Sequence, residues 1–317
     1  MTLRHLNFLL SFALVLAMTT STQAQRLVSV DFGSSSPTRL YSGLAAAPDV
    51  AGGGTWNGAF FSTTISGLVD STDAATPVGI TFSDGNNFDS ARDQEVSAAG
   101  GFSNLFRDYI FVNNLIDDGN FSFAESLVTA SIFGLEPGNA YDLYFYGQGN
   151  NFSNTPSSGG QNVGVRIGTD VRHTSHDGVR GGDGLLVEDI EYVLFTGIVA
   201  DSLGQINFEH FNPGFGLHFT DSTFFDSSLL AAGDPLAVDA DGVNSRFHIL
   251  NGIQIVGEFP PLLLGDTNLD GEVTFADIPS FIAILQAGTF LAQADCNQDG
   301  VVDFADIPAF IAILQAS

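Results

Sequence analysis

Residues 265–287 read GDTNLDGEVTFADIPSFIAILQA, and residues 294–316 read ADCNQDGVVDFADIPAFIAILQA, so one unit occurs twice at an offset of 29 residues. Each copy starts with an Asp- and Asn-rich stretch of the kind found in loops and continues with apolar residues at helical spacing. Self-similarity at a fixed period is typical of repeated supersecondary units. The sequence therefore predicts a small C-terminal module over residues 265–317, built from two loop-and-helix copies.

Each copy carries oxygen-bearing residues at the spacing of a calcium loop. Calcium takes six to eight oxygen ligands, and an EF-hand loop supplies them from positions 1, 3, 5, 7, 9 and 12, with Gly at position 6 and a backbone carbonyl at position 7. Gly271 and Gly300 occupy position 6. The sequence predicts two calcium ions, bound in the first loop by Asp266, Asn268, Asp270, Glu272, Thr274 and Asp277, and in the second loop by Asp295, Asn297, Asp299, Val301, Asp303 and Asp306.

A helix is predicted after each loop. Pro279 and Pro308 fall in the first turns, where a missing N–H group costs nothing. Because the apolar residues of the two helices recur at helical spacing, we expect the helices to pack on each other through Ile278, Phe281, Ile282 and Leu285, and through Ile307, Phe310, Ile311 and Leu314. Cys296, at loop position 2, is expected to point outward and not to bind the metal.

The two loops with Asp at position 12, each followed by an amphipathic helix, resemble the type I dockerin domain. The resemblance covers about a sixth of the chain and implies a small all-α tandem EF-hand domain that docks onto a cohesin-like or other protein partner in an extracellular assembly. Where dockerins usually present polar and basic residues to cohesin, this chain has Phe275, Ala276, Phe304 and Ala305, and no Lys or Arg follows Arg246.

Residues 25–258 contain short alternating or apolar runs separated by Gly, Asn, Asp and Ser clusters, which predicts a mainly β domain, a β-sandwich, joined to the module by a linker over residues 259–264. The domain contains Val30-Asp-Phe32, Tyr141-Asp-Leu-Tyr-Phe-Tyr146 and Leu250-Asn-Gly-Ile-Gln-Ile-Val256. These short strand sequences resemble the jelly-roll sandwiches with which exported bacterial proteins bind carbohydrate. Polysaccharide is thus an expected ligand. The predicted strands are Leu27 to Phe32, Phe60 to Ser66, Val78 to Phe82, Leu127 to Leu135, Tyr141 to Tyr146, Val163 to Ile167, Tyr192 to Ile198, Gln205 to Glu209 and Phe247 to Val256.

The first 24 residues read as a secretory signal peptide, with Arg4, an apolar run from Phe8 to Met18 and a small polar segment before Gln25. We therefore expect a secreted, extracellular protein, and no later segment reads as a membrane span. The formal net charge of -27 comes from 36 acidic residues against nine basic ones, all of which are Arg. Because nucleic acid is bound through clustered basic residues, which this chain lacks, we expect no nucleic-acid partner.

Candidate sugar-binding residues are Trp56, Tyr144 and Tyr146 for stacking, and Asn150, Asn151 and Arg166 for hydroxyl groups. Alternation along Tyr141 to Tyr146 places Tyr144 and Tyr146 on one face, which we expect to be the surface. The alternative functions are a polysaccharide-degrading enzyme and a structural cell-surface protein. For the enzyme, Asp189 and Glu191 would form a carboxylate pair on one strand face, and no residue is assigned as catalytic.

Overall fold

The structure is a computed structural model that describes residues 25–32, 40–48, 54–59, 63–83, 88–90, 102, 104–107, 109–113, 127–148, 163–174, 184–211, 247–288, 290–299 and 301–317. The predicted signal peptide, Asn150, Asn151 and Gly300 lie outside the described residues.

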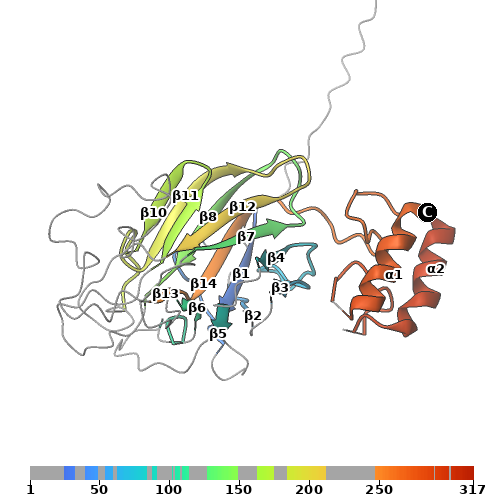
Figure 1. Ribbon diagram of the computed structural model, residues 1–317, viewed down its shortest axis with the longest axis horizontal. Helices are drawn as coiled ribbons and strands as arrows, with labels where there is room; N and C mark the ends of the chain where they lie inside the picture. The colour runs from blue at the N-terminus through green and yellow to red at the C-terminus, as the bar shows by residue number, and fades with distance from the viewer. Residues whose placement is uncertain are drawn as a thin grey trace, which may run out of the picture.

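Two large antiparallel-rich sheets make up most of the described β domain (Figure 1). The first has the order β11-β8-β14-β1-β2, the second β10-β9-β12-β7-β4-β3, and a small third sheet has the order β13-β6-β5. The strands are β1 (Arg26–Phe32), β2 (Asn57–Ala59), β3 (Thr64–Ile65), β4 (Gly79–Phe82), β5 (Phe88–Ser90), β6 (Ile110–Asn113), β7 (Leu127–Phe133), β8 (Ala140–Tyr146), β9 (Gly164–Ile167), β10 (Asp170–His173), β11 (Tyr192–Val199), β12 (Ile206–Phe211), β13 (Phe247–Leu250) and β14 (Gly252–Gly257).

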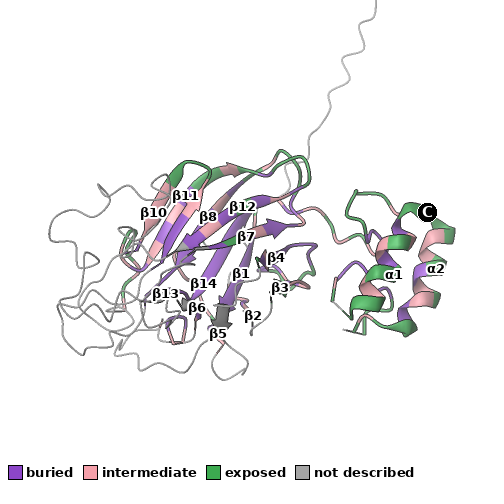
Figure 2. Ribbon diagram, in the orientation of Figure 1, coloured by how far each residue is buried: buried purple, intermediate pink, exposed green. Residues whose placement is uncertain are grey.

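The main core lies between the two large sheets, where apolar residues from alternate positions of both meet. The rings of Phe145 on β8 and Phe208 on β12 have centroids 5.0 Å apart, and those of Phe32 on β1 and Phe82 on β4 are 5.8 Å apart. Figure 2 shows buried residues running along these strands. The prediction of a mainly β domain followed by a small helical end is confirmed, whereas the jelly-roll and EF-hand assignments stay predictions.

Several strand predictions need correction. The run from Phe247 to Val256 is two strands, because Asn251 interrupts it and accepts a hydrogen bond from the backbone N–H of Gln148 through its side chain (2.8 Å). The predicted strand from Phe60 to Ser66 is described only as β3 at its C-terminal end. Four short strands of three or four residues were not predicted, namely β2, β5, β6 and β10.

The C-terminal module contains the two predicted helices, α1 (Ile278–Ala287) and α2 (Ile307–Ala316), each preceded by a 3-10 turn (Phe275–Asp277 and Phe304–Asp306). The stacked rings of Phe281 and Phe310, with centroids 4.0 Å apart, confirm that the helices pack on each other. Ile282 and Ile311 are instead 46% and 47% exposed, so their predicted place in the contact was wrong. No helix in the described residues is long and apolar enough to cross a membrane.

Cys296 also differs from its expected orientation. Its side chain is buried in the module core beside Phe281, Phe310 and Ala294. Burial raises the pKa of the thiol to about 12, and the charges of Asp306 and Asp295 add to the effect. Cys296 is therefore a core residue, because the short loop turns position 2 toward the helices.

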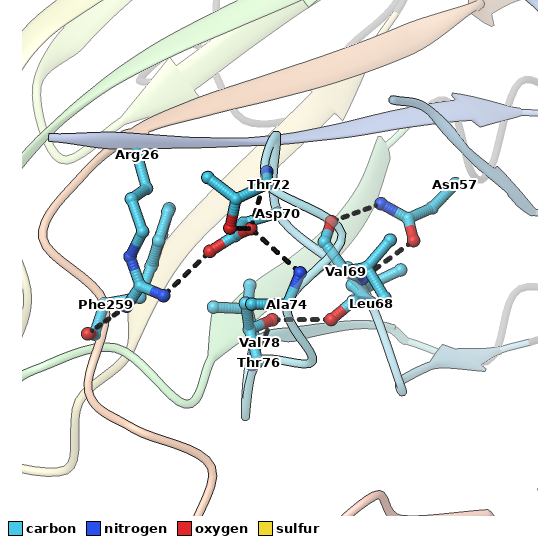
Figure 3. A network of polar contacts seen from close by, with 10 residues as sticks. All are labelled: Arg26, Asn57, Leu68, Val69, Asp70, Thr72, Ala74, Thr76, Val78 and Phe259. Carbon is cyan, nitrogen blue, oxygen red and sulfur yellow. Dashed lines mark hydrogen bonds and ion pairs between the residues drawn. The ribbon is translucent and has the colours of Figure 1, made fainter. Parts of the chain in front are cut away.

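Within the described residues, one contact joins the linker to the β domain and another joins the module to it. Arg26 on β1 donates to the carbonyl oxygen of Phe259 (2.6 Å) at the start of the linker and pairs with Asp70 (2.7 Å), as Figure 3 shows. The Ser66 hydroxyl donates to the carbonyl oxygen of Phe290 (2.7 Å), between the two repeats. The segment between the two repeats thus contacts the residue that follows β3.

Gly204→Ala is expected to destabilise the β domain by about 2 kcal/mol or more, because Gly204 has a φ of 68° and an added Cβ would lie 2.2 Å from the carbonyl oxygen of Leu135. Gly138 has a φ of 80° with nothing within 4 Å of such a Cβ, so Gly138→Ala isolates the conformational cost of about 1 kcal/mol. Urea unfolding compares the two variants. Equal losses would contradict the steric argument.

Candidate metal centre

Asp277 links the two ends of the first loop. Its side chain is fully buried, and its Oδ1 accepts hydrogen bonds from the backbone N–H groups of Thr267 (2.8 Å) and Asn268 (3.0 Å). Its Oδ2 accepts from the N–H of Thr274 (2.8 Å). The position-12 carboxylate therefore fixes where the loop begins and where it ends.

The second loop has the same construction. Asp306 is fully buried, its Oδ1 accepts from the N–H of Asn297 (3.1 Å), and its Oδ2 accepts from the N–H of Asp303 (2.9 Å). At position 1, Asp266 accepts from the N–H of Asp270 (3.1 Å), and Asp295 accepts from the N–H of Asp299 (3.1 Å). Equivalent residues of the two repeats thus make equivalent contacts.

Both loops turn through left-handed backbone at position 4. Leu269 has a φ of 62° and Gln298 a φ of 60°, a region that side chains other than Gly rarely adopt. Gly271, at position 6, has a φ of 84°. The two left-handed residues were not predicted, because neither Leu nor Gln favours this conformation; the close turn imposes it.

The Asn and Asp side chains at positions 3 and 5 contact each other in both loops. Asn268 Nδ2 donates to Asp270 Oδ2 (2.8 Å), and Asn297 Nδ2 donates to Asp299 Oδ2 (3.0 Å). The remaining oxygens of the two Asp side chains accept from the N–H groups of the position-7 residues, Glu272 and Val301, each at 3.0 Å.

Charge accumulates in the first loop. Burial raises the pKa of Asp266, the N–H groups of Gly271 and Asp270 lower it, and the negative charges of Asp277 and Asp270 raise it again, with a net increase. Within the described residues, no group of three or more His, Cys, Asp and Glu side chains is gathered in metal-binding geometry. The carboxylates nevertheless lie close enough to repel one another, and their oxygens retain lone pairs for a cation. An all-oxygen set fits calcium better than it fits softer metals.

Thr274 and Asp303, predicted as ligands at position 9, also act as helix caps. The Thr274 hydroxyl accepts from the N–H of Ala276 (3.1 Å), and Asp303 accepts from the N–H of Ala305 (2.6 Å). Asp277 and Asp306 complete the two capping boxes. The signal was present in the sequence as TFAD and DFAD, a polar cap followed three residues later by an acid.

The three candidate stacking residues lie together, but under cover. Trp56, Tyr144 and Tyr146 are 5%, 6% and 0% exposed, and the rings of Trp56 and Tyr146 have centroids 6.1 Å apart. Tyr146 donates to the side-chain oxygen of Gln254 and accepts from the N–H of Ala46 (2.8 Å). The expectation that this face of β8 is exposed was wrong, because loop residues pack on it. None of the three rings faces solvent in this structure.

The candidate carboxylate pair is not on one strand face. Asp189 lies in the turn before β11 with a φ of 66°. Glu191 is 1% exposed, and its Oε2 accepts from the N–H of Val187 (2.8 Å). The expected shared face is therefore wrong, and Glu191 holds a turn together.

No family model and no curated protein matches the chain. Among solved structures, the plant receptor-like kinase ANX2 matches at 12% identity over 61% of this chain and 53% of its own, with a TM-score of 0.29. The enzymatically active domain of bacteriophage CBA120 tailspike protein 4 matches at 11% identity over 57% and 19%, with a TM-score of 0.21. TmCBM61 in complex with β-1,4-galactotriose matches at 8% identity over 59% and 89%, with a TM-score of 0.19. The chain spans about half of the first of these and a fifth of the second.

Proposed function

We propose that residues 265–317 form a calcium-binding module that attaches the secreted protein to an extracellular partner protein. The repeated loop architecture carries this proposal, because both copies place the same acids and amides around a left-handed turn and close it with a buried Asp. Crowded carboxylates in a chain of net charge -27 repel one another, and a divalent cation would relieve that repulsion.

Exposed apolar residues at equivalent positions of the repeats support attachment to a protein. Phe275 is 75% exposed and Phe304 is 77% exposed, although the loop Asp two residues after each of them is buried. Ile282 and Ile311 are also about half exposed. Large exposed apolar side chains that recur in this way favour a protein interface, and the absence of Lys and Arg after Arg246 favours a partner with apolar pockets, cohesin-like or of another kind.

Calcium removal is expected to unfold the module and leave the β domain folded, because the module buries few apolar side chains of its own. Isothermal titration calorimetry of residues 25–317 should find two calcium ions per chain. Amide resonances of residues 265–317 should lose dispersion when EGTA is added, while those of the β domain persist. Unchanged resonances in EGTA, or no calcium uptake, would refute the metal part of the proposal.

Attachment is tested separately on the producing cells. The double variant Phe275→Ser, Phe304→Ser is expected to bind calcium normally but to be lost from the cell surface or matrix, because both repeats lose their exposed ring. Ser280→Ala, at the first turn of α1, serves as the control. Full retention of the double variant would contradict a role of these rings in attachment.

A further inference from the structure

The outer face of the six-stranded sheet carries small polar side chains in two rows. Thr81 on β4 pairs with Ser131 on β7, and Ser131 pairs with Asn207 on β12. Cross-strand partners share a face of the sheet, and neighbouring strands lie about 4.8 Å apart. These three residues therefore form one row across three adjacent strands, which lie side by side in Figure 1.

The second row lies two residues along each strand. Thr129 pairs with Glu209, and Glu209 pairs with Arg166 on β9. The Ser83 hydroxyl accepts from the N–H of Thr129 (3.1 Å) and extends this row beyond β7. The intervening residues of the strands point the other way into the main core. We call the residues of the two rows the polar face.

A hollow of about 560 Å³ lies over the polar face, a volume typical of ligand sites. Arg166 and Glu209, whose side chains are 19% and 21% exposed, form an ion pair within it. Among the residues that line the hollow, Arg166 is the one base and Glu209 the one acid, so the lining has no net charge. In a chain of net charge -27, this neutrality sets the polar face apart.

We propose that the polar face binds a neutral, hydroxyl-rich polysaccharide chain. Hydroxyl, amide and ion-paired groups can donate hydrogen bonds to sugar hydroxyls and accept hydrogen bonds from them. Because the two charges of the ion pair balance, no net charge faces the neutral ligand. An anionic ligand would have to compete with Glu209 for the one lining guanidinium, and a cation would have to compete with Arg166 for the one lining carboxylate. The site is formed by the β domain, so the inference is independent of the calcium module.

Asn207 is the residue that tests this site. It lies at the β12 end of the first row, and its exposed side chain makes no hydrogen bond to another residue within the described part of the chain. Its amide group is therefore available to donate and to accept. Losing one or two hydrogen bonds to a ligand corresponds to about a fivefold to tenfold weaker affinity.

The experiment is affinity electrophoresis of residues 25–317 in calcium, through gels that contain neutral soluble glucans, galactans or mannans, or a polyanionic pectin. At least one neutral polysaccharide should retard the protein, with affinity reduced about fivefold to tenfold by Asn207→Ala and unchanged by Thr196→Ala, an exposed position of β11 in the other sheet. Thermal unfolding should be the same for both variants. Retardation by pectin alone, no retardation on any gel, or equal binding by Asn207→Ala would overturn the proposal.

Discussion

Asp277→Asn is expected to abolish calcium binding by the first loop and to unfold much of residues 265–287. The carboxylate accepts three backbone hydrogen bonds, two at Oδ1 and one at Oδ2. In Asn an NH2 group replaces one of these oxygens, and this group cannot accept a hydrogen bond. Asn therefore loses either the bond from Thr274 or both bonds from Thr267 and Asn268, and the bonds that remain no longer go to a charged group. Because hydrogen bonds to a charged group contribute about 1.5 to 3 kcal/mol each, the module is expected to lose about 3 kcal/mol. Hydrogen exchange at the amides of α1, measured in saturating calcium, reports the effect.

Glu272→Gln is the matched control, because it makes the same change of charge in the same loop. The Glu272 side chain is exposed, and position 7 is expected to bind calcium through the backbone carbonyl. Protection of the α1 amides should therefore stay near that of the wild type. If the two variants behaved alike, net charge and not the placement of the Asp277 carboxylate would govern the loop.

The module could be predicted largely from local sequence. Its structure depends on the loop ligands, on Gly271 and on the prolines at the helix starts, each of which sets the conformation of residues close to it in sequence. The repeat alone therefore indicated both helices and their mutual packing. The fate of Ile282 and Ile311 could not be predicted in this way. The module core is built on Phe281 and Phe310, with Ile284, Leu285, Ile313 and Leu314 among the residues packed against it. Ile282 and Ile311 each follow one of these Phe residues directly, and they lie about half exposed.

Burial of the five-stranded sheet on both faces is the main feature of the β domain that the sequence did not reveal. Alternation along β8 marks two faces, and the usual pattern of one buried and one solvated face suggested that Tyr144 and Tyr146 were exposed. Residues of the segment 40–48, together with Phe102, Leu105 and Phe106, instead pack over them as a second apolar cluster. These covering segments have no apolar periodicity, so their own sequences do not indicate which face of the sheet they cover.

The polar face could have been found from the sequence. Thr129-Ala-Ser131 and Asn207-Phe-Glu209 each alternate a small or charged polar residue with an apolar one, as a half-buried strand does. The candidate stacking rings are core residues in this fold, whereas Arg166, the described candidate for binding hydroxyl groups, lies in the polar face. The pairing of β7 with β12, which brings these two distant segments together, is not contained in the pattern of either segment.

Arg26→Met is expected to destabilise the β domain by about 3 kcal/mol at neutral pH. Asp70 is fully buried, and Arg26, with 22% of its side chain exposed, is its charged partner. Removing one partner of a buried ion pair leaves an uncompensated charge, which typically costs about 3 to 5 kcal/mol; the partial exposure of Arg26 favours the lower figure. Arg26 also donates to the carbonyl oxygen of Phe259, so the start of the linker should loosen as well. Urea unfolding followed by tryptophan fluorescence measures the loss.

The pH dependence gives this prediction a second signature. Burial alone would raise the pKa of Asp70, but hydrogen bonds from Thr72 and Ala74 and the charge of Arg26 outweigh it and lower the pKa. A carboxyl with a lowered pKa stabilises the fold above its unfolded-state pKa, and this stability is lost as the pH falls through the folded-state value. In Arg26→Met the folded pKa rises, so acid unfolding should begin at a higher pH.

Arg172→Met provides the comparison for an exposed pair. Arg172 and Asp170 have side chains that are 36% and 48% exposed, and exposed ion pairs contribute about 0 to 1 kcal/mol because water and salt screen them. Arg172 also donates to the carbonyl oxygen of Leu194, as Arg26 does to that of Phe259, so the two variants differ mainly in the burial of the acidic partner. The loss in Arg172→Met should therefore be smaller, and the acid limb of its stability curve should match that of the wild type. If Arg26→Met cost no more than Arg172→Met, the hydrogen bonds from Thr72 and Ala74 would suffice to stabilise the buried Asp70 carboxylate, and the Arg26 contact would contribute only to holding the linker.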